Sequence, residues 1–284
     1  MKMKTRTFIL AAALGVCASM SAADITAVYT KKVDVGCDAH HPTLSPNGKV
    51  VLFTSEDYTG LKSLNLLTNE VSVIDETPKA GFNPRFTADG NEVVYRTAIK
   101  EDGISQNDVK RYSFASKAKT QLMKHSKDMV NTPSLVGDTY AYAFAKKQAM
   151  EISINGVKKE INPIEYGYRY LWPSVSPSAT KLVFSEVYSG LFVSNVDGTQ
   201  AKNLASRGDF PCWVGDKFVV ALSTKDDGYV ITSAKIIAIE VATGKVTTLT
   251  DDSVRVDGLT AIADKIVYTT EDGEMYIMNI LINE

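Results

Sequence analysis

The sequence predicts an all-β fold in which six small antiparallel sheets stand around one axis, which is a six-bladed β-propeller. Three observations predict it. A proline followed by a short strand, a tight turn and a second, apolar strand recurs five times along the chain, weaker copies included, and a sixth copy lacks the proline. Neighbouring copies lie 38 to 49 residues apart, which is the size of one four-stranded blade. A strand-like segment precedes the first copy, and the last copy is too short for a fourth strand.

Residues 1–23 have the pattern of a secretory signal peptide. Three basic residues precede an apolar run over 8–17 that is too short to span a bilayer as a helix. Ser21 and Ala23 then place small residues where a signal peptidase reads, which predicts cleavage before Asp24. A core helix or a membrane anchor would fit this short, asymmetrically flanked run poorly.

The expected destination is therefore outside the cytoplasm, in the periplasm of a bacterium. Lipid attachment at Cys17 is disfavoured because the branched Val16 precedes that cysteine. No other segment reaches 18 consecutive apolar residues, so we expect no membrane span in the mature chain.

The composition is that of an ordinary globular protein, with 44% hydrophobic and 23% charged residues. Losing the three basic residues of the leader would change the net charge from −2 to −5, which does not favour a nucleic-acid partner. Cys37 and Cys212 would be the two cysteines left, and we expect both to be free, buried thiols.

The repeats predict the blades in order. A proline, or Leu259 in its place, opens the first strand of each copy, where no sheet hydrogen bond is lost. A turn such as Pro46-Asn47-Gly48 follows, and then a continuously apolar strand such as 50–53, typical of a strand buried on both faces. Two more strands complete each of the first five copies. The expected blades are 38–78, 79–125, 126–163, 164–206, 207–252 and 253–284.

The last of these blades ends with a third strand at 274–281. We expect residues 25–35 to supply its fourth strand and so to close the ring. The alternative, a frayed N-terminal arm, is disfavoured by Val28, Val33 and Val35.

The phrase Pro-x-x-Ser-Pro-Asn-Gly-Lys followed by a β run resembles the repeat of the TolB-type β-propellers. The copies from His41, Asn83 and Trp172 carry the resemblance best, and all six cover most of the chain after the leader. The TolB propeller binds a peptidoglycan-associated lipoprotein over its channel mouth, so the resemblance implies a similar binding role. About 17 residues separate Asp24 from the first repeat, so we expect the N-terminal α/β domain of TolB, with its inner-membrane partner, to have no counterpart.

Histidines are the first candidate site residues. His40 and His41 stand where the first blade begins, and His125 is the third histidine. Some propeller lyases have a His-rich metal site, so resemblance to them leaves a metal site open. Adjacent residues of a strand point to opposite sides, however, and the sequence has no zinc-ligand spacing. Surface or turn histidines without a metal are therefore the favoured interpretation.

Motifs for enzymatic chemistry are missing from the sequence. There is no Gly-x-Ser-x-Gly elbow, phosphate loop, dinucleotide fingerprint or calcium loop. Acidic pairs such as Asp226-Asp227 lie in predicted turns and are expected to be solvated. We therefore expect no catalytic residue and no cofactor.

An aromatic segment over 166–172 is the most unusual local feature. Strand alternation would place Tyr166, Tyr168, Tyr170 and Trp172 on one side, with Arg169 beside them. Such a row is typical of a protein or glycan contact patch, although the rings could instead cap the core. Tyr58 and Tyr188 recur in equivalent turns that should open on the same face, and Asn83 is the remaining candidate there. The polar stretch 99–108 is expected to be a long surface turn, either a lid or a plain insertion.

Three functions remain open. The favoured one is an exported, monomeric, non-catalytic propeller that binds a protein or glycan of the cell envelope. The alternative is a lyase-like carbohydrate-active enzyme with a histidine and metal site in its channel. A third is a structural domain whose catalytic partner is another chain.

Overall fold

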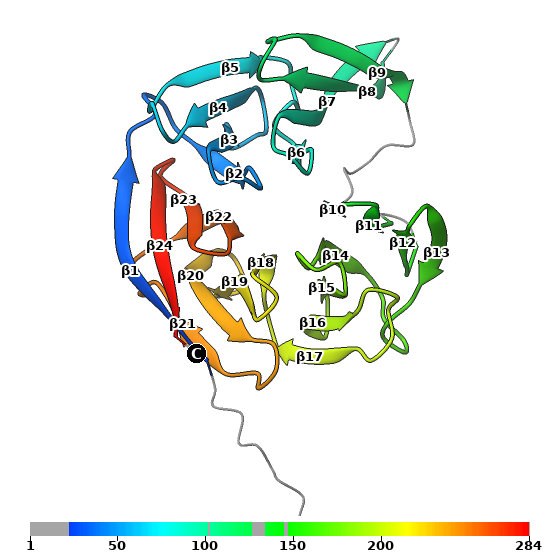
Figure 1. The fold of residues 1–284 in the computed structure, drawn as a ribbon, viewed down its shortest axis with the longest axis vertical. Coiled ribbons are helices and arrows are strands. Elements are labelled where there is room, and N and C mark those ends of the chain that lie inside the picture. Colours follow the sequence, from blue (N-terminus) through cyan, green and yellow to red (C-terminus); the bar gives the residue numbers. More distant parts are fainter. Residues whose placement is uncertain (1–22, 102, 127–133, 145–146, 284) are drawn as a thin grey trace, which may run out of the picture.

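The computed structural model describes residues 23–101, 103–126, 134–144 and 147–283, so the predicted signal peptide lies outside the described residues, apart from its last position. The described residues form 24 strands and no helix. These strands make six separate four-stranded sheets, which stand around a central axis (Figure 1). The predicted six-bladed β-propeller is confirmed.

Each of the first three blades is a run of consecutive strands. Blade 1 contains β2 (His40–Leu44), β3 (Val50–Thr54), β4 (Leu61–Asn65) and β5 (Val71–Asp75). Blade 2 contains β6 (Arg85–Phe86), β7 (Glu92–Glu101), β8 (Ile104–Ser113) and β9 (Lys119–Ser126). Blade 3 contains β10 (Ser134–Val136), β11 (Thr139–Ala143), β12 (Met150–Ile154) and β13 (Val157–Ile161).

Blades 4 and 5 follow the same plan, and blade 6 differs from it. Blade 4 contains β14 (Tyr170–Val175), β15 (Lys181–Glu186), β16 (Gly190–Asn195) and β17 (Lys202–Ala205). Blade 5 contains β18 (Asp209–Val214), β19 (Phe218–Asp226), β20 (Ile231–Glu240) and β21 (Val246–Thr248). Blade 6 combines β22 (Val256–Ile262), β23 (Lys265–Thr270) and β24 (Met275–Asn283) with β1 (Asp24–Val33).

The apolar second strands are buried because each lies between two neighbouring blades. On β3, Val51 and Phe53 pack in a cluster with residues of blade 6, whereas Leu52 packs in a cluster with Val93 and Tyr95 of blade 2. All of these side chains are almost fully buried. Burying a side chain of this size stabilises the fold by about 1.5–3 kcal/mol. The blades are therefore held together by the strands that the sequence shows as continuous apolar runs.

The ring is closed by the first strand, as predicted. β1 pairs antiparallel with β24, from Asp24 opposite Asn283 to Val33 opposite Met275. Asp24 forms an ion pair with Lys245 of blade 5, which fixes the start of β1 against that blade. At the other end, Ala39 N donates to the carbonyl of Gly273 at 2.9 Å. The chain just after the predicted leader therefore joins the two ends of the propeller.

Two local expectations were wrong. Residues 99–108 are mostly paired strand rather than a long turn, because Ile99 lies opposite Gln106 in the extended hairpin of β7 and β8. Cys37 is exposed rather than buried, because it stands in the link between β1 and β2. Both Cys37 and Cys212 are free.

Strand direction assigns each turn to one of the two faces of the ring. Successive strands of a blade are antiparallel, so the links between blades and the turns between second and third strands lie on the same face. We call it the link face.

Among the described residues no helix is long and apolar enough to cross a membrane.

Candidate functional site

A strained backbone bulge recurs where four of the inner strands begin. The residue before the proline has a positive φ in blades 1, 2, 4 and 5: His41 (52°), Asn83 (53°), Trp172 (48°) and Phe210 (51°). In blades 1, 4 and 5 the strand register shifts around the same residue. This left-handed conformation is unfavourable for bulky residues and costs about 1–3 kcal/mol at each position. It persists only because the surrounding blade imposes it.

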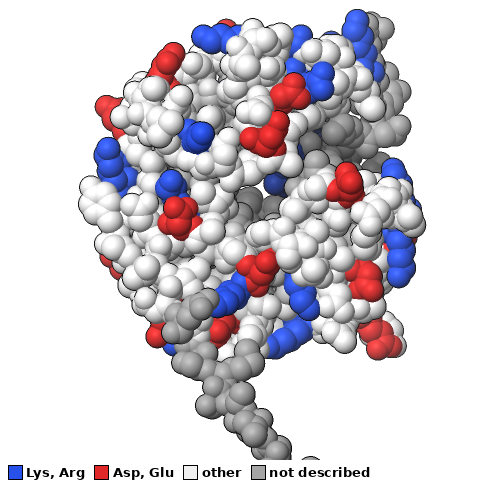
Figure 2. Space-filling view, in the orientation of Figure 1, with Lys and Arg blue, Asp and Glu red and all other residues white. Residues whose placement is uncertain are grey.

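The bulges surround a cavity at the mouth of the central channel. Its volume is about 440 Å³, and all four bulge residues line it. Its wall also contains Tyr58, Phe82, Arg85, Tyr142 and Arg169. A space-filling view along the axis shows the molecule hollowed at its centre (Figure 2). The bulge therefore turns one residue of each of these blades toward a shared space.

His41 forms one wall of this cavity. Its ring stacks on Tyr58, with centroids 4.0 Å apart and planes 12° apart, and its Nε2 is 3.1 Å from the carbonyl oxygen of Glu56. Because the partner is a carbonyl, Nε2 carries the proton and donates it. Burial lowers the pKa of His41 from its usual 6.5, so the ring is mainly neutral at pH 7. His41 is therefore held as a flat, neutral ring with one engaged nitrogen.

His40 points away from the cavity into the seam between blades 1 and 6. Its Nδ1 is 2.5 Å from Asp257 Oδ2, and the hydroxyl of Thr269 donates to the other oxygen of Asp257 at 2.5 Å. His125 lies on β9, and its side chain is outside the described residues. The described residues contain no group of three His, Cys, Asp or Glu side chains that could hold a metal. The structure thus separates the two adjacent histidines rather than joining them in one site.

The aromatic segment 166–172 does not form the predicted one-sided row. Tyr166 is 91% exposed with a positive φ, and Tyr168 is 53% exposed, whereas Tyr170 is 1% exposed. Strand alternation fails because β14 begins only at Tyr170. The ring of Tyr170 packs edge-on against Phe184 at 5.4 Å, and its hydroxyl accepts a hydrogen bond from Ile164 N. The side chain of Tyr170 is part of the core of blade 4 rather than of an exposed patch.

Tyr168 and Tyr188 form an exposed pair beside the mouth, with ring centroids 5.5 Å apart. Both are positioned by Glu186, which sequence analysis did not single out. Its buried carboxylate accepts hydrogen bonds from four backbone amides, those of Tyr168 (3.0 Å), Arg169 (3.3 Å), Tyr188 (3.1 Å) and Ser189 (2.8 Å). Burial alone would raise the pKa of Glu186, but these hydrogen bonds outweigh it and the pKa is lowered.

Arg85 is the second residue that sequence analysis missed. It follows the proline of blade 2 and lines the cavity. Its signal is visible in the repeat: the residue after the proline, or after Leu259, is small in the other copies, namely Thr43, Ser134, Ser174, Cys212 and Thr260. A position that faces the crowded axis favours small residues, so a single arginine there is the exception that calls for a reason.

The chemistry of the cavity is that of a binding site with aromatic walls. Trp172 and Phe210 lie with ring centroids 4.6 Å apart, and the guanidinium of Arg96 lies 4.1 Å from the ring centroid of Phe82. No Asp or Glu is found among the described residues that line it. Of the predicted candidates, His41, Tyr58, Asn83, Arg169, Tyr170 and Trp172 contribute to the lining, while His40, Tyr166, Tyr168 and Tyr188 do not.

Comparison with known proteins supports the fold. No protein-family model matches the sequence, and no curated protein matches it. TolB from Acinetobacter baumannii has a TM-score of 0.54 at 10% identity over 85% of this chain, which spans 54% of that protein. A putative TolB from Agrobacterium tumefaciens has a TM-score of 0.59 at 17% identity, covering 86% of this chain and 90% of its own. Virginiamycin B lyase from Staphylococcus aureus has a TM-score of 0.56 at 13% identity, covering 92% and 100%. At these identities the likeness shows a propeller fold of the TolB type.

Proposed function

We propose that this chain is an exported, non-catalytic propeller that binds a protein or another component of the cell envelope across its channel mouth. One observation carries the proposal: four bulge residues are held in an unfavourable backbone conformation around a single cavity. Strain of this kind clusters at binding and active sites because selection for stability alone would remove it. The exposed Tyr168 and Tyr188 add an aromatic contact surface next to that mouth.

The proposal includes export and a monomeric state. The leader predicts a mature chain that begins at Asp24 in the periplasm, which mass spectrometry of the periplasmic fraction would establish. The fold likeness to TolB-type propellers supports this placement. A sedimentation measurement on the mature protein would report its oligomeric state.

The experiment that tests binding uses the exposed tyrosines. A photo-crosslinking amino acid is placed at position 188, and at position 29 as a control, because Tyr29 is also exposed but lies on the outer strand β1. We expect position 188, and not 29, to capture one envelope component in living cells. Changing Tyr168 to Ala should reduce that capture, since the two rings adjoin. Equal capture from both positions would contradict the proposal. Tyr170 is unsuitable for such a test because its loss would disturb the core.

The lyase-like alternative requires a metal site, which the proposed binding function does not. It needs a metal held by histidines in the channel, and His41 is the one histidine among the described residues that line the cavity. No specific contact favours this alternative. Metal analysis of the purified protein together with a polysaccharide degradation screen would reveal it.

A further inference from the structure

The charge of Arg85 is not balanced by any of the described residues. Its Nε is buried and has no hydrogen-bond partner, and no hydrogen bond or ion pair joins Arg85 to any of the described residues. Buried charges in proteins are almost always paired, because an unpaired one loses its hydration without compensation. Arg85 also stands where the other blades have small residues. Its guanidinium therefore calls for a partner that the described residues do not supply.

Among the residues that the structure describes, the groups that face Arg85 do not supply a negative charge. Across the channel lies Cys212, and burial raises the pKa of its thiol to about 11, so it is neutral at pH 7. Burial also lowers the pKa of Arg85, yet a guanidinium starts so high that it stays protonated. His41 is mainly neutral, and Arg169 at the rim adds a second positive charge. Asp257 is engaged by His40 and Thr269 outside the lining.

The rest of the cavity wall favours a ligand that has a flat or apolar part next to its charged group. Phe82, Tyr142, Trp172 and Phe210 line the same cavity as Arg85. A volume of about 440 Å³ holds a small ring or the end of a peptide. Aromatic rings bind such groups by stacking, and they add no charge of their own.

We propose that the cavity binds a carboxylate-bearing group, with the Arg85 guanidinium as its counter-ion and the aromatic rings around its apolar part. The proposal rests on the proposed function and names the chemistry that the channel mouth recognises. A single guanidinium matches the one negative charge and the two oxygens of a carboxylate, which it holds through two parallel hydrogen bonds. A phosphate dianion would need the guanidinium of Arg169 at the rim as well as that of Arg85, so phosphate is the competing anion that the experiment includes. The carboxylate comes either from a free small acid or from a partner protein.

The first experiment uses small probes on the purified mature protein. Benzoate is titrated against its neutral amide, benzamide, and against inorganic phosphate, with the fluorescence of Trp172 in the cavity wall as the readout. We expect benzoate to bind and to raise the melting temperature, as any ligand of the native state does. Arg85→Gln should weaken benzoate binding about 10- to 100-fold, the range of a hydrogen bond to a charged group. Arg207→Gln is the matched control, because Arg207 is an exposed arginine paired with Asp226 outside the cavity.

The second experiment separates the two sources of carboxylate. Peptides that end in a free α-carboxylate are compared with amidated ones, and peptides with an internal Glu are compared with Gln versions. Binding of benzoate alone indicates a small acid, whereas binding of either acidic peptide indicates a protein. Both outcomes support the proposal if they depend on Arg85.

Other outcomes overturn it. Equal binding of benzoate and benzamide, or tighter binding of phosphate, would show that a carboxylate is not what the cavity selects. A ligand-free Arg85→Met variant should melt at a higher temperature than wild type, because an unbalanced charge has been removed; a lower melting temperature would assign Arg85 a structural role instead. Failure of the crosslinking at position 188, with benzoate binding intact, would overturn the proposed envelope function and leave the carboxylate site standing.

Discussion

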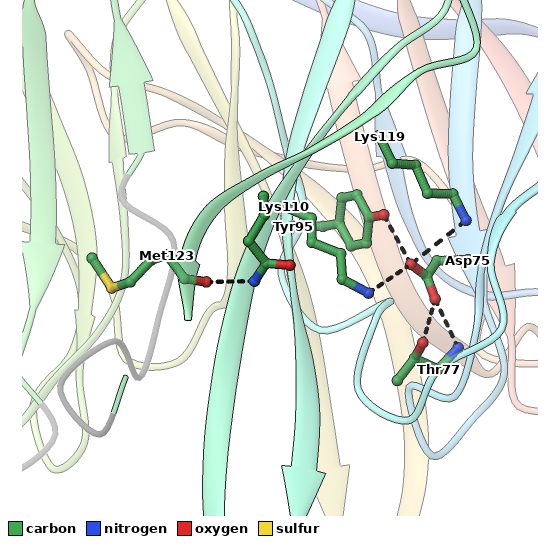
Figure 3. Close-up of polar contacts among 7 residues, drawn as sticks. Asp75, Thr77, Tyr95, Lys110, Lys119 and Met123 are labelled. Carbon is green, nitrogen blue, oxygen red and sulfur yellow. Dashed lines mark hydrogen bonds and ion pairs between the residues drawn. The ribbon is translucent and has the colours of Figure 1, made fainter. Parts of the chain in front are cut away.

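At the scale of single residues, the balance between burial and hydrogen bonding decides what each charged group does. Arg85 and Asp75 show the two extremes. Arg85 has no partner among the described residues, whereas the carboxylate of Asp75 is surrounded by donors (Figure 3). Tyr95 donates to Oδ2 at 2.9 Å, Lys110 reaches the same oxygen at 3.2 Å, and Thr77 donates to Oδ1 from its amide and its hydroxyl. Asp75 ends blade 1 and its Tyr and Lys partners belong to blade 2, so it joins the two blades.

Asp75 leads to a prediction on the pH dependence of stability. Burial alone would raise its pKa, but the hydrogen bonds from Thr77, Tyr95 and Lys110 outweigh burial and hold the pKa at about 2. A pKa below the unfolded value of about 4 stabilises the fold by roughly 2 kcal/mol above pH 4, and this contribution is lost as the pH falls through 2. Asp75→Asn should therefore lower the free energy of unfolding at pH 7 by about 2–3 kcal/mol.

The measurement is chemical denaturation of wild type and Asp75→Asn between pH 7 and pH 2. We expect the difference between the two proteins to shrink toward acid pH. Asp138→Asn serves as the control, because Asp138 is exposed in the turn between β10 and β11. A difference that stays constant with pH would show that the carboxylate of Asp75 is not held in its charged form.

At the scale of strands and turns, the repeat is informative about strands and uninformative about the bulges. Apolar runs and Pro-Asn-Gly turns are local signals, so the strands and the closure by residues 24–33 could be predicted. A residue before proline ordinarily adopts an extended conformation. The local sequence therefore does not predict the positive φ at Trp172. Strand alternation predicted that Tyr170 belongs to an exposed row, whereas its side chain is buried in the core of blade 4. Arg85 was visible in the aligned repeats, as the one large side chain at a position of small ones.

Glu186 leads to a prediction about the turn that holds the exposed tyrosines. Gln has one carboxyl-type oxygen where Glu186 offers two, and it places an NH2 group against backbone amides. Glu186→Gln should lower the free energy of unfolding by about 1–3 kcal/mol. Hydrogen exchange should speed up at the amides of Tyr168, Arg169, Tyr188 and Ser189. Glu165→Gln is the control, since Glu165 is exposed in the link between β13 and β14 that also contains Tyr168. Unchanged exchange in Glu186→Gln would remove Glu186 from its positioning role.

At the scale of the whole molecule, the pairing of β1 with β24 makes the propeller a closed ring. The cavity at the channel mouth is lined by residues of several blades, so its shape depends on that closure. Thr26 lies opposite Leu281, and both side chains are exposed, so a disulfide between cysteines at these positions would join the chain almost end to end. In the chain-entropy description, a crosslink that closes so long a loop stabilises the native state by up to about 5 kcal/mol. We expect Thr26→Cys with Leu281→Cys, in a Cys37→Ser background, to crosslink under oxidising conditions. The melting temperature should rise and return to that of the starting protein when reductant is added.

Thr26→Cys with Asn279→Cys is the control, because Asn279 pairs with Tyr29 and is out of register with Thr26. Equal crosslinking of both pairs would show that β1 slides along β24, and the cavity at the channel mouth would then lack the fixed ring on which its geometry depends.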